Sequence, residues 1–223
     1  MRRFIAGLSV GAEFTIVFLG AFGLFIFSTL VALLARDHQV AASEGDLRLL
    51  VVIEVVLFAV LATFMRVRGW TLARVGFHPS LKETLQGLAV AVVSYCVWAL
   101  VWLAFTSVVP QAARPAVSFG TLAPQLATII VASIVNAIYE ETFVSGYLMT
   151  VIKEHSTAWT AINISVGVRL LYHLYQGIPA VTDVVPIGLI FAYWYARQGS
   201  LWPLIVAHAL IDIFGLLSYL GRG

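Results

Sequence analysis

The sequence has little charge and a single cysteine. Of its 223 residues only 11% are Asp, Glu, Lys or Arg, and Cys96 is the one cysteine. One cysteine excludes an intrachain disulfide and provides no metal-binding or redox motif. With 13 Lys and Arg against 11 Asp and Glu, the net charge is +2, which gives no indication of a nucleic-acid partner. Apolar residues are abundant instead, at 61% of the chain.

Long apolar runs recur along the chain and predict its fold class. The mean hydropathy is +0.97, and most runs reach the ~17–25 residues that cross a bilayer as a helix. The runs are Val10–Leu34, Leu49–Phe64, Leu88–Val109, Leu122–Met149, Ala158–Tyr175, Ile178–Tyr195 and Leu201–Leu220. We therefore expect an all-α fold, a polytopic membrane helical bundle of about seven transmembrane helices. Residues 1–223 would form a single integral membrane domain in the lipid bilayer.

The basic residues predict an orientation for this bundle. In an alternating seven-span arrangement, one side carries Arg2, Arg3, Arg66, Arg68, Arg74, Lys82, Lys153 and Arg197. The other side carries Arg36, Arg48, Arg114 and Arg222. Because Lys and Arg accumulate in cytoplasmic loops, we expect a cytoplasmic N-terminus and an external C-terminus.

Four charged residues inside the predicted spans need an explanation. They are Glu140, Glu141, Arg169 and Asp212. Each charged side chain at mid-bilayer costs ~2.5–3.5 kcal/mol, so four unpaired charges would cost on the order of 10–14 kcal/mol. We therefore expect these side chains to be paired, neutralised or placed in a water-filled cavity.

Helical spacing places these residues on particular faces. Residues three, four and seven apart share a face, so Glu140 continues a polar stripe with Asn136 and Ser133. The stripe that leads to Glu141 is apolar, because it consists of Ala137 and Ile134. Glu140 is thus the better candidate for a polar interior.

Two later helices bring further polar groups to a similar depth. Arg169 and His173 are one turn apart in one predicted helix, and His208 and Asp212 are one turn apart in another. A carboxylate removed from water can act as a general base, and an imidazole can orient a water or stabilise an oxyanion. Asp212 could fix the tautomer of His208. The cluster as a whole is suited to bind and deprotonate a water molecule.

Other buried polar groups have simpler interpretations. We interpret Glu13 and Glu54 as structural or interfacial residues, because they lie nearer the ends of their spans. Tyr172 is more typical of packing than of substrate contact. The whole polar cluster could also be structural, or part of an ion pathway.

Three segments resemble one known family. They are EETFVSGYL (residues 140–148), RLLYHLYQG (169–177) and HALID (208–212), and they are similar to motifs of the CAAX protease and bacteriocin-processing family of intramembrane endopeptidases. The similarity covers roughly residues 85–215, with the motif-bearing helices in residues 122–215. It implies that Glu140 and Glu141 are the paired glutamates of the family, with Glu140 catalytic. It also implies catalytic roles for His173, for His208 and for Asp212.

The chain departs from the family pattern at two positions. Where the family has an arginine four residues after the second glutamate, this chain has Ser145, and where it has an aromatic residue four positions before the histidine, this chain has Arg169. We expect Arg169 to pair with Glu141 or Asp212 and to replace the missing arginine. A bacterial inner-membrane location is then favoured, and a prenylated substrate is not.

The sequence thus predicts an intramembrane endopeptidase that cleaves a membrane-associated peptide or protein. Glu140 would activate a water with help from the histidines, while Arg169 and Asn136 give support. We expect no cofactor or metal, since no HExxH motif is present, but zinc bound by His173, His208 and a carboxylate stays open. The alternative is a non-enzymatic transporter or a binding or immunity protein that uses the same polar site.

Overall fold

The computed structural model describes residues 5–35, 41–108, 118–119 and 124–220. Within these ranges the helices are α2 (Val10–Ala35), α3 (Glu44–Val67), α4 (Leu81–Val108), α5 (Leu126–Glu140), η2 (Glu141–Met149), α6 (Thr150–His155), α7 (Ala158–His173), η3 (Leu174–Gln176), α8 (Ile178–Gln198) and α9 (Trp202–Leu220). Two strands of two residues, β1 (Ala41–Ala42) and β2 (Ser118–Phe119), pair in parallel. The all-α fold is confirmed.

The helices agree with the predicted runs, although not all are equally apolar. By length and composition α2, α3, α4 and the continuous segment Leu126–His155 could each cross a membrane, and Trp202–Ser218 is a shorter apolar helix. The predicted runs at 158–175 and 178–195 form α7 and α8. α7 has only 16 residues and includes Arg169, so length and composition alone do not mark it as a span.

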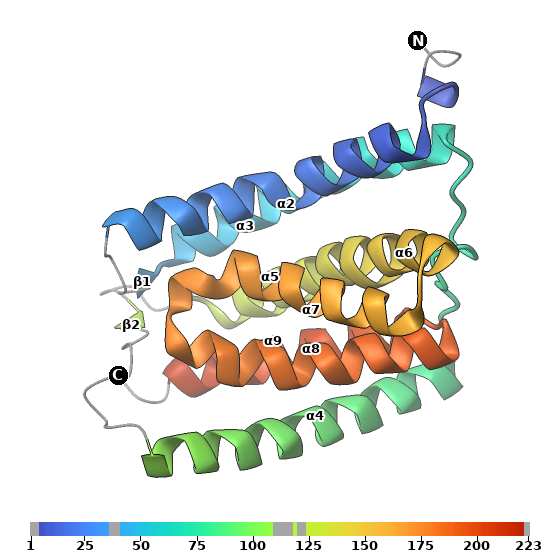
Figure 1. The fold of residues 1–223 in the computed structure, drawn as a ribbon. Helices are drawn as coiled ribbons and strands as arrows, with labels where there is room; N and C mark the ends of the chain where they lie inside the picture. The colour runs from blue at the N-terminus through green and yellow to red at the C-terminus, as the bar shows by residue number, and fades with distance from the viewer. Residues whose placement is uncertain (1–4, 36–40, 109–117, 120–123, 221–223) are drawn as a thin grey trace.

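The helices lie side by side along one direction (Figure 1). α2 and α3 form one side of the bundle, α4 lies on the opposite side, and the remaining helices lie between them. α5 packs against α3 and α9, α7 packs against α8 and α2, and α4 packs against α8 and α9. The three helices that carry the polar motifs are therefore interior to the bundle.

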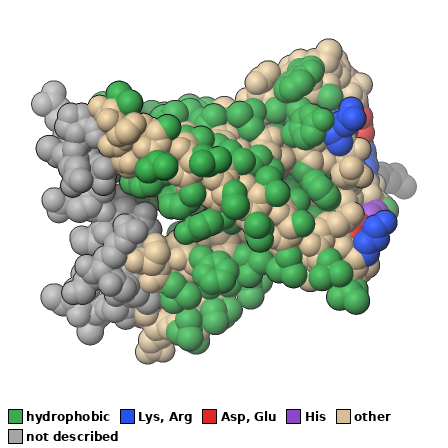
Figure 2. All heavy atoms as spheres, turned by 90° about the horizontal axis from the view of Figure 1, so that it is seen from below, with side chains coloured by type: hydrophobic (Ala, Val, Ile, Leu, Met, Phe, Trp, Pro, Cys, Tyr) green, Lys and Arg blue, Asp and Glu red, His purple; other side chains and the backbone are tan. Residues whose placement is uncertain are grey.

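The outer helices expose many large apolar side chains, as expected for helices that face lipid. Phe27 on α2 is 64% exposed, and Leu100 and Leu103 on α4 are each 68% exposed. Figure 2 shows hydrophobic side chains along the length of one face, with the Lys and Arg side chains at one end. Surfaces of this kind mark contact with a membrane, and the chain is an integral membrane protein.

The basic end of the bundle is where α3, α6 and α8 end and where α4 begins. It holds the described basic residues Arg66, Arg68, Arg74, Lys82, Lys153 and Arg197. Arg48 lies near the start of α3, at the other end. Arg2, Arg3, Arg36, Arg114 and Arg222 lie outside the described residues.

A buried cluster around Glu13 ties the basic end together; we call it the Glu13 cluster. Arg68 Nε donates to Glu13 Oε2 at 2.5 Å, and Trp70 Nε1 donates to Glu13 Oε1 at 2.8 Å. Tyr147 in η2 also donates to Oε1, at 3.3 Å. The Glu13 side chain joins α2, η2 and the connection that follows α3, which confirms its structural interpretation.

The same connection also fixes the start of α9. Gly76 has a φ of +76° and its carbonyl accepts a hydrogen bond of 2.8 Å from Leu201 N, in the turn between α8 and α9. A Cβ atom at Gly76 would lie 2.0 Å from the carbonyl oxygen of Gly199. Glycine is required here both for the backbone conformation and for the close approach. The helix that carries His208 is therefore anchored at the basic end.

Candidate active site

The site begins where the regular α-helix of α5 ends. From Glu141 to Met149 the backbone forms η2, a π-helix, which is wider than an α-helix and is often found at functional sites. Gly146 lets η2 approach the connection between α3 and α4, because a Cβ atom at Gly146 would lie 3.1 Å from Val75 Cβ. The change of helix type means that a face traced along α5 with α-helical spacing does not continue through η2.

Glu141 is the most enclosed acid of the site. Its side chain is fully buried, and it accepts hydrogen bonds from Arg169 Nη2 at 2.7 Å, from Ser145 Oγ at 2.7 Å and from His208 Nδ1 at 2.7 Å. The apolar stripe on α5 therefore does not describe the surroundings of Glu141. Ala137 and Ile134 lie on α5 itself, whereas the partners of Glu141 come from α7, α9 and η2.

Arg169 occupies the place between the two glutamates. Its Nη2 lies 2.7 Å from Glu141 Oε2, and its Nη1 lies 3.5 Å from Glu140 Oε2. The predicted pairing of Arg169 with Glu141 is confirmed; the described ion pairs do not join Arg169 to Asp212. Nη2 also donates to Ser145 Oγ at 3.2 Å. The guanidinium therefore lies beside position 145, where the family has its own arginine.

Glu140 is held through one carboxylate oxygen. Tyr172 donates its hydroxyl to Oε2 at 2.6 Å, and Arg169 Nη1 reaches the same oxygen. The described residues donate no hydrogen bond to Oε1. Tyr172 is itself fixed, because Phe22 stacks on its ring at 5.6 Å and Thr29 Oγ1 donates to its carbonyl oxygen at 3.0 Å. Glu140 is thus oriented, with one oxygen left for another partner.

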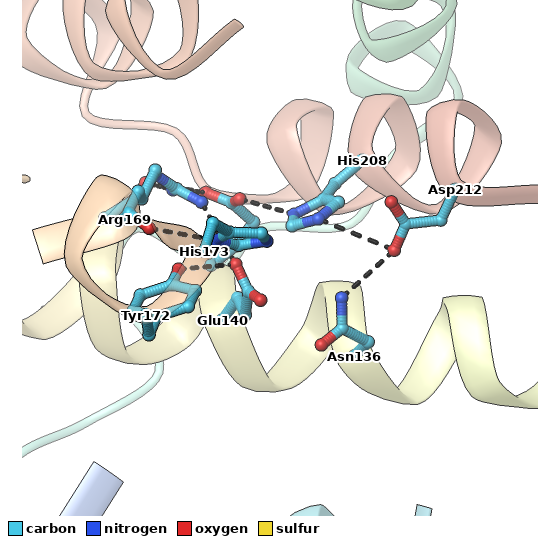
Figure 3. Close-up of polar contacts among 9 residues, drawn as sticks. Asn136, Glu140, Arg169, Tyr172, His173, His208 and Asp212 are labelled. Carbon is cyan, nitrogen blue, oxygen red and sulfur yellow. Dashed lines mark hydrogen bonds and ion pairs between the residues drawn. The ribbon is translucent and has the colours of Figure 1, made fainter. Parts of the chain in front are cut away.

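The two histidines are oriented by hydrogen bonds at Nδ1. His173 Nδ1 lies 2.9 Å from the carbonyl oxygen of Arg169, which can only accept, so Nδ1 carries the proton. His208 Nδ1 likewise donates to Glu141. Both Nε2 atoms are then available for chemistry. Figure 3 shows Glu140 of α5, His173 of α7 and His208 of α9 turned toward one another.

Asp212 has a different partner from the one expected. His208 Nε2 is 3.6 Å from Asp212 Oδ2, and Asn136 Nδ2 donates to the same oxygen at 3.0 Å. The idea that Asp212 fixes the tautomer of His208 is wrong, because Glu141 makes the short hydrogen bond to Nδ1. Asn136 supports Asp212, on the same stripe of α5 as Glu140.

Sequence reasoning missed one member of the site and misplaced a second buried acid. Tyr172 was interpreted as a packing residue, yet it lies three residues after Arg169 on the same helical face, and this spacing could have revealed it. Glu54 was interpreted as lying near a span end, which is wrong, since it is 1% exposed and lies in the interior of α3. The hydrophobic periodicity of α3 does not indicate a buried acid at Glu54, because its neighbours on α3 are apolar.

The residues present do not form a recognisable metal centre. In the part of the chain that the structure describes, no three His, Cys, Asp or Glu side chains converge to hold a metal ion. The Arg169 guanidinium lies within 3.5 Å of both paired glutamates, where a cation would otherwise sit. We therefore assign no step to a metal.

Comparison with known proteins agrees with the motifs. Residues 121–214 match the family model described as type II CAAX prenyl endopeptidase Rce1-like. This segment contains Glu140, Glu141, His173, His208 and Asp212. No curated protein and no solved structure match the chain. The resemblance found from the three motifs is confirmed over this segment.

Proposed function

We propose that the chain, whose residues 121–214 belong to the CAAX protease family, is an intramembrane endopeptidase that hydrolyses a peptide bond in a membrane-associated substrate. The observation that carries the proposal is the state of Glu140, which is oriented through Oε2 and receives no hydrogen bond at Oε1 from the described residues. A general base needs a carboxylate oxygen within reach of the proton that it removes. Oε1 provides that oxygen.

The reaction follows from the orientation of the neighbouring groups. A water between Oε1 of Glu140 and Nε2 of His173 gives one proton to Glu140, and its oxygen bonds to the carbonyl carbon of the peptide. The C=O electron pair moves to the oxygen and forms an oxyanion. When the oxyanion collapses, the C–N bond breaks and Glu140 returns its proton to the leaving amine.

His208 is placed to stabilise the oxyanion. Its ring lies between Glu141, at 2.7 Å from Nδ1, and Asp212, at 3.6 Å from Nε2. Two carboxylates on either side stabilise a positively charged imidazolium. Its Nε2–H can then donate to the oxyanion, at a site where surrounding water is scarce and such a bond is strong.

Arg169 balances the charge of the paired glutamates. A buried carboxylate without a partner is costly, and removal of one partner from a buried ion pair costs about 3–5 kcal/mol. The bond to Glu141 fixes the acid that orients His208, and the weaker contact at 3.5 Å adds a cation beside Glu140. Arg169 is in this view a positioning residue.

The setting of the reaction follows from the distribution of charge. With the basic end in the cytoplasm, the N-terminus is cytoplasmic, the C-terminus is external and the site lies within the membrane. We place the protein in a bacterial inner membrane, with a substrate that need not be prenylated.

A transporter or a binding or immunity protein is the second candidate, because intramembrane acids and histidines also serve ion and substrate pathways. Purified protein is incubated in detergent with a library of membrane-associated peptides, as wild type and as Glu140→Gln. Cleavage by the wild type alone supports the endopeptidase. If neither protein cleaves any peptide, while the wild type binds or transports a solute, the second candidate is favoured.

A further inference from the structure

Glu54 is a buried acid that the proposed mechanism does not use. Its side chain is 1% exposed, and Oε2 has no hydrogen-bond partner among the described residues. Glu13, by contrast, accepts hydrogen bonds at both carboxylate oxygens. A buried polar group without a partner is unusual enough to require an explanation.

The packing of α3 on α5 places Glu54 at the level of the site. At one end Glu44 accepts hydrogen bonds from Gln125 N at 2.9 Å and from Thr128 Oγ1 at 2.6 Å. Further along, the rings of Phe58 and Phe143 are 5.7 Å apart. The two helices thus run side by side in the same direction.

Glu54 comes one turn before Phe58 on α3, and Glu140 comes nearly one turn before Phe143 on the neighbouring helix. The two acids therefore lie at the same depth.

The ionisable groups at the level of Glu54 are those of the site. Glu140 lies on α5, and Asp212 and His208 lie on α9, where Asp212 accepts a hydrogen bond from Asn136 of α5. On α2 the described ionisable residue is Glu13, which is paired with Arg68 at the basic end. The described ion pairs include none with Glu54. An ionised carboxylate would therefore be buried, unpaired and close to two other acids, whereas a neutral acid avoids most of that cost.

We propose that Glu54 is a proton-binding residue beside the site, a neutral carboxylic acid at neutral pH. Its proton keeps a further negative charge away from Glu140 and Asp212. An added negative charge there would oppose the negative charge that develops on the oxyanion and would slow the reaction. Glu54 thereby acts on the reaction through the electrostatics of the site, without touching the reacting atoms, and this kinetic consequence rests on the proposed function.

Infrared spectroscopy tests the protonation state without any assay of activity. Spectra at neutral pH are compared for wild type, Glu54→Gln and the control Glu44→Gln, since Glu44 is ion-paired with Arg48. Glu54→Gln should lose carboxylic acid C=O absorption equal to one group, while Glu44→Gln should match the wild type. Equal absorption in Glu54→Gln and wild type would overturn the proposal, as would a wild-type spectrum without this absorption.

The pH profile of peptide cleavage tests the consequence. Glutamine imitates the neutral acid, so at neutral pH Glu54→Gln should retain kcat within about threefold of wild type. At alkaline pH the wild type should lose activity as Glu54 ionises, and Glu54→Gln should retain more. A loss above about tenfold at neutral pH, or an unchanged alkaline limb, contradicts this role. If no peptide is cleaved, the proposed function fails, and the infrared result still decides the state of Glu54.

Discussion

Two buried glutamate–arginine clusters in the described part of the chain differ in how their carboxylates are engaged. In the Glu13 cluster, Arg68, Trp70 and Tyr147 engage both oxygens of the carboxylate. In the candidate active site, Arg169 and Tyr172 engage only Oε2 of Glu140. Both clusters combine a cation with hydrogen-bond donors from aromatic residues. A saturated carboxylate holds helices together, whereas a carboxylate with a free oxygen can accept a proton.

The largest difference between the clusters should appear when each glutamate is changed to glutamine. Glu140→Gln should reduce kcat by at least about 10³-fold, because the general base is lost, while the protein stays folded. Glu13→Gln should retain most activity and lower the melting temperature, because Arg68 loses its ionic partner. Peptide cleavage and thermal unfolding in detergent measure both effects. Equal loss of activity in the two variants would remove the distinction.

The histidines of the active site have no counterpart in the Glu13 cluster. His173→Ala and His208→Ala should each lower kcat by ~10²–10⁴-fold, as expected when an acid–base or oxyanion partner is lost. His155, at the end of α6 and outside both clusters, gives a matched control as His155→Ala. The kcat of the three variants is measured by steady-state kinetics. A histidine variant with wild-type kcat would have no role in the reaction.

Glu141 combines features of the two clusters. It is saturated like Glu13, but one of its partners is His208. Glu141→Gln should therefore lower kcat by about 10²-fold and also destabilise the fold, since Arg169 would lose its shortest ionic contact. Paired measurements of cleavage and unfolding distinguish this mixed effect. Wild-type stability together with wild-type activity would show that the Glu141 contacts are dispensable.

An arginine at position 145 should partly replace Arg169. Arg169→Leu should destabilise the protein by about 3–5 kcal/mol, because two buried acids lose their cation. Arg169→Leu combined with Ser145→Arg should recover part of this loss, since the side chain at 145 lies beside the same guanidinium. Unfolding free energies of the single and double variants provide the measurement. No recovery would mean that an arginine at 145 does not reach Glu141.

The smallest effect should come from chelators. Arg169 lies within 3.5 Å of both paired glutamates, and the proposed chemistry activates water with Glu140 and His173 and without a metal. Treatment with a strong zinc chelator should therefore leave kcat within about twofold of its initial value. Metal content is measured in parallel. Stoichiometric zinc, with activity lost on its removal, would favour a metal-assisted reaction instead.

Much of this arrangement could be predicted from the sequence, because charged residues are rare inside long apolar runs and therefore stand out. Arg169 and Glu141 are charges in apolar runs, and the need to pair them predicts their contact. Hydropathy likewise gives the helices, since long apolar runs leave few alternatives. The surroundings of Glu141 could not be predicted, because they depend on α7 and α9 and on a change of helix type. Glu54 stayed hidden for a related reason, since its depth depends on how α3 packs against α5.

The π-helix between Glu141 and Met149 has a consequence for how this fold could evolve. Glu141 at one end of the segment belongs to the active site, and Tyr147 near the other end belongs to the Glu13 cluster. Deletion of one residue between them would change the angular position of everything downstream about the helix axis. No single substitution could repair that rotation, so the length of this stretch should tolerate less variation than its composition. The nine residues of η2 thus set the rotational relation between the Glu13 cluster at the basic end and the candidate active site.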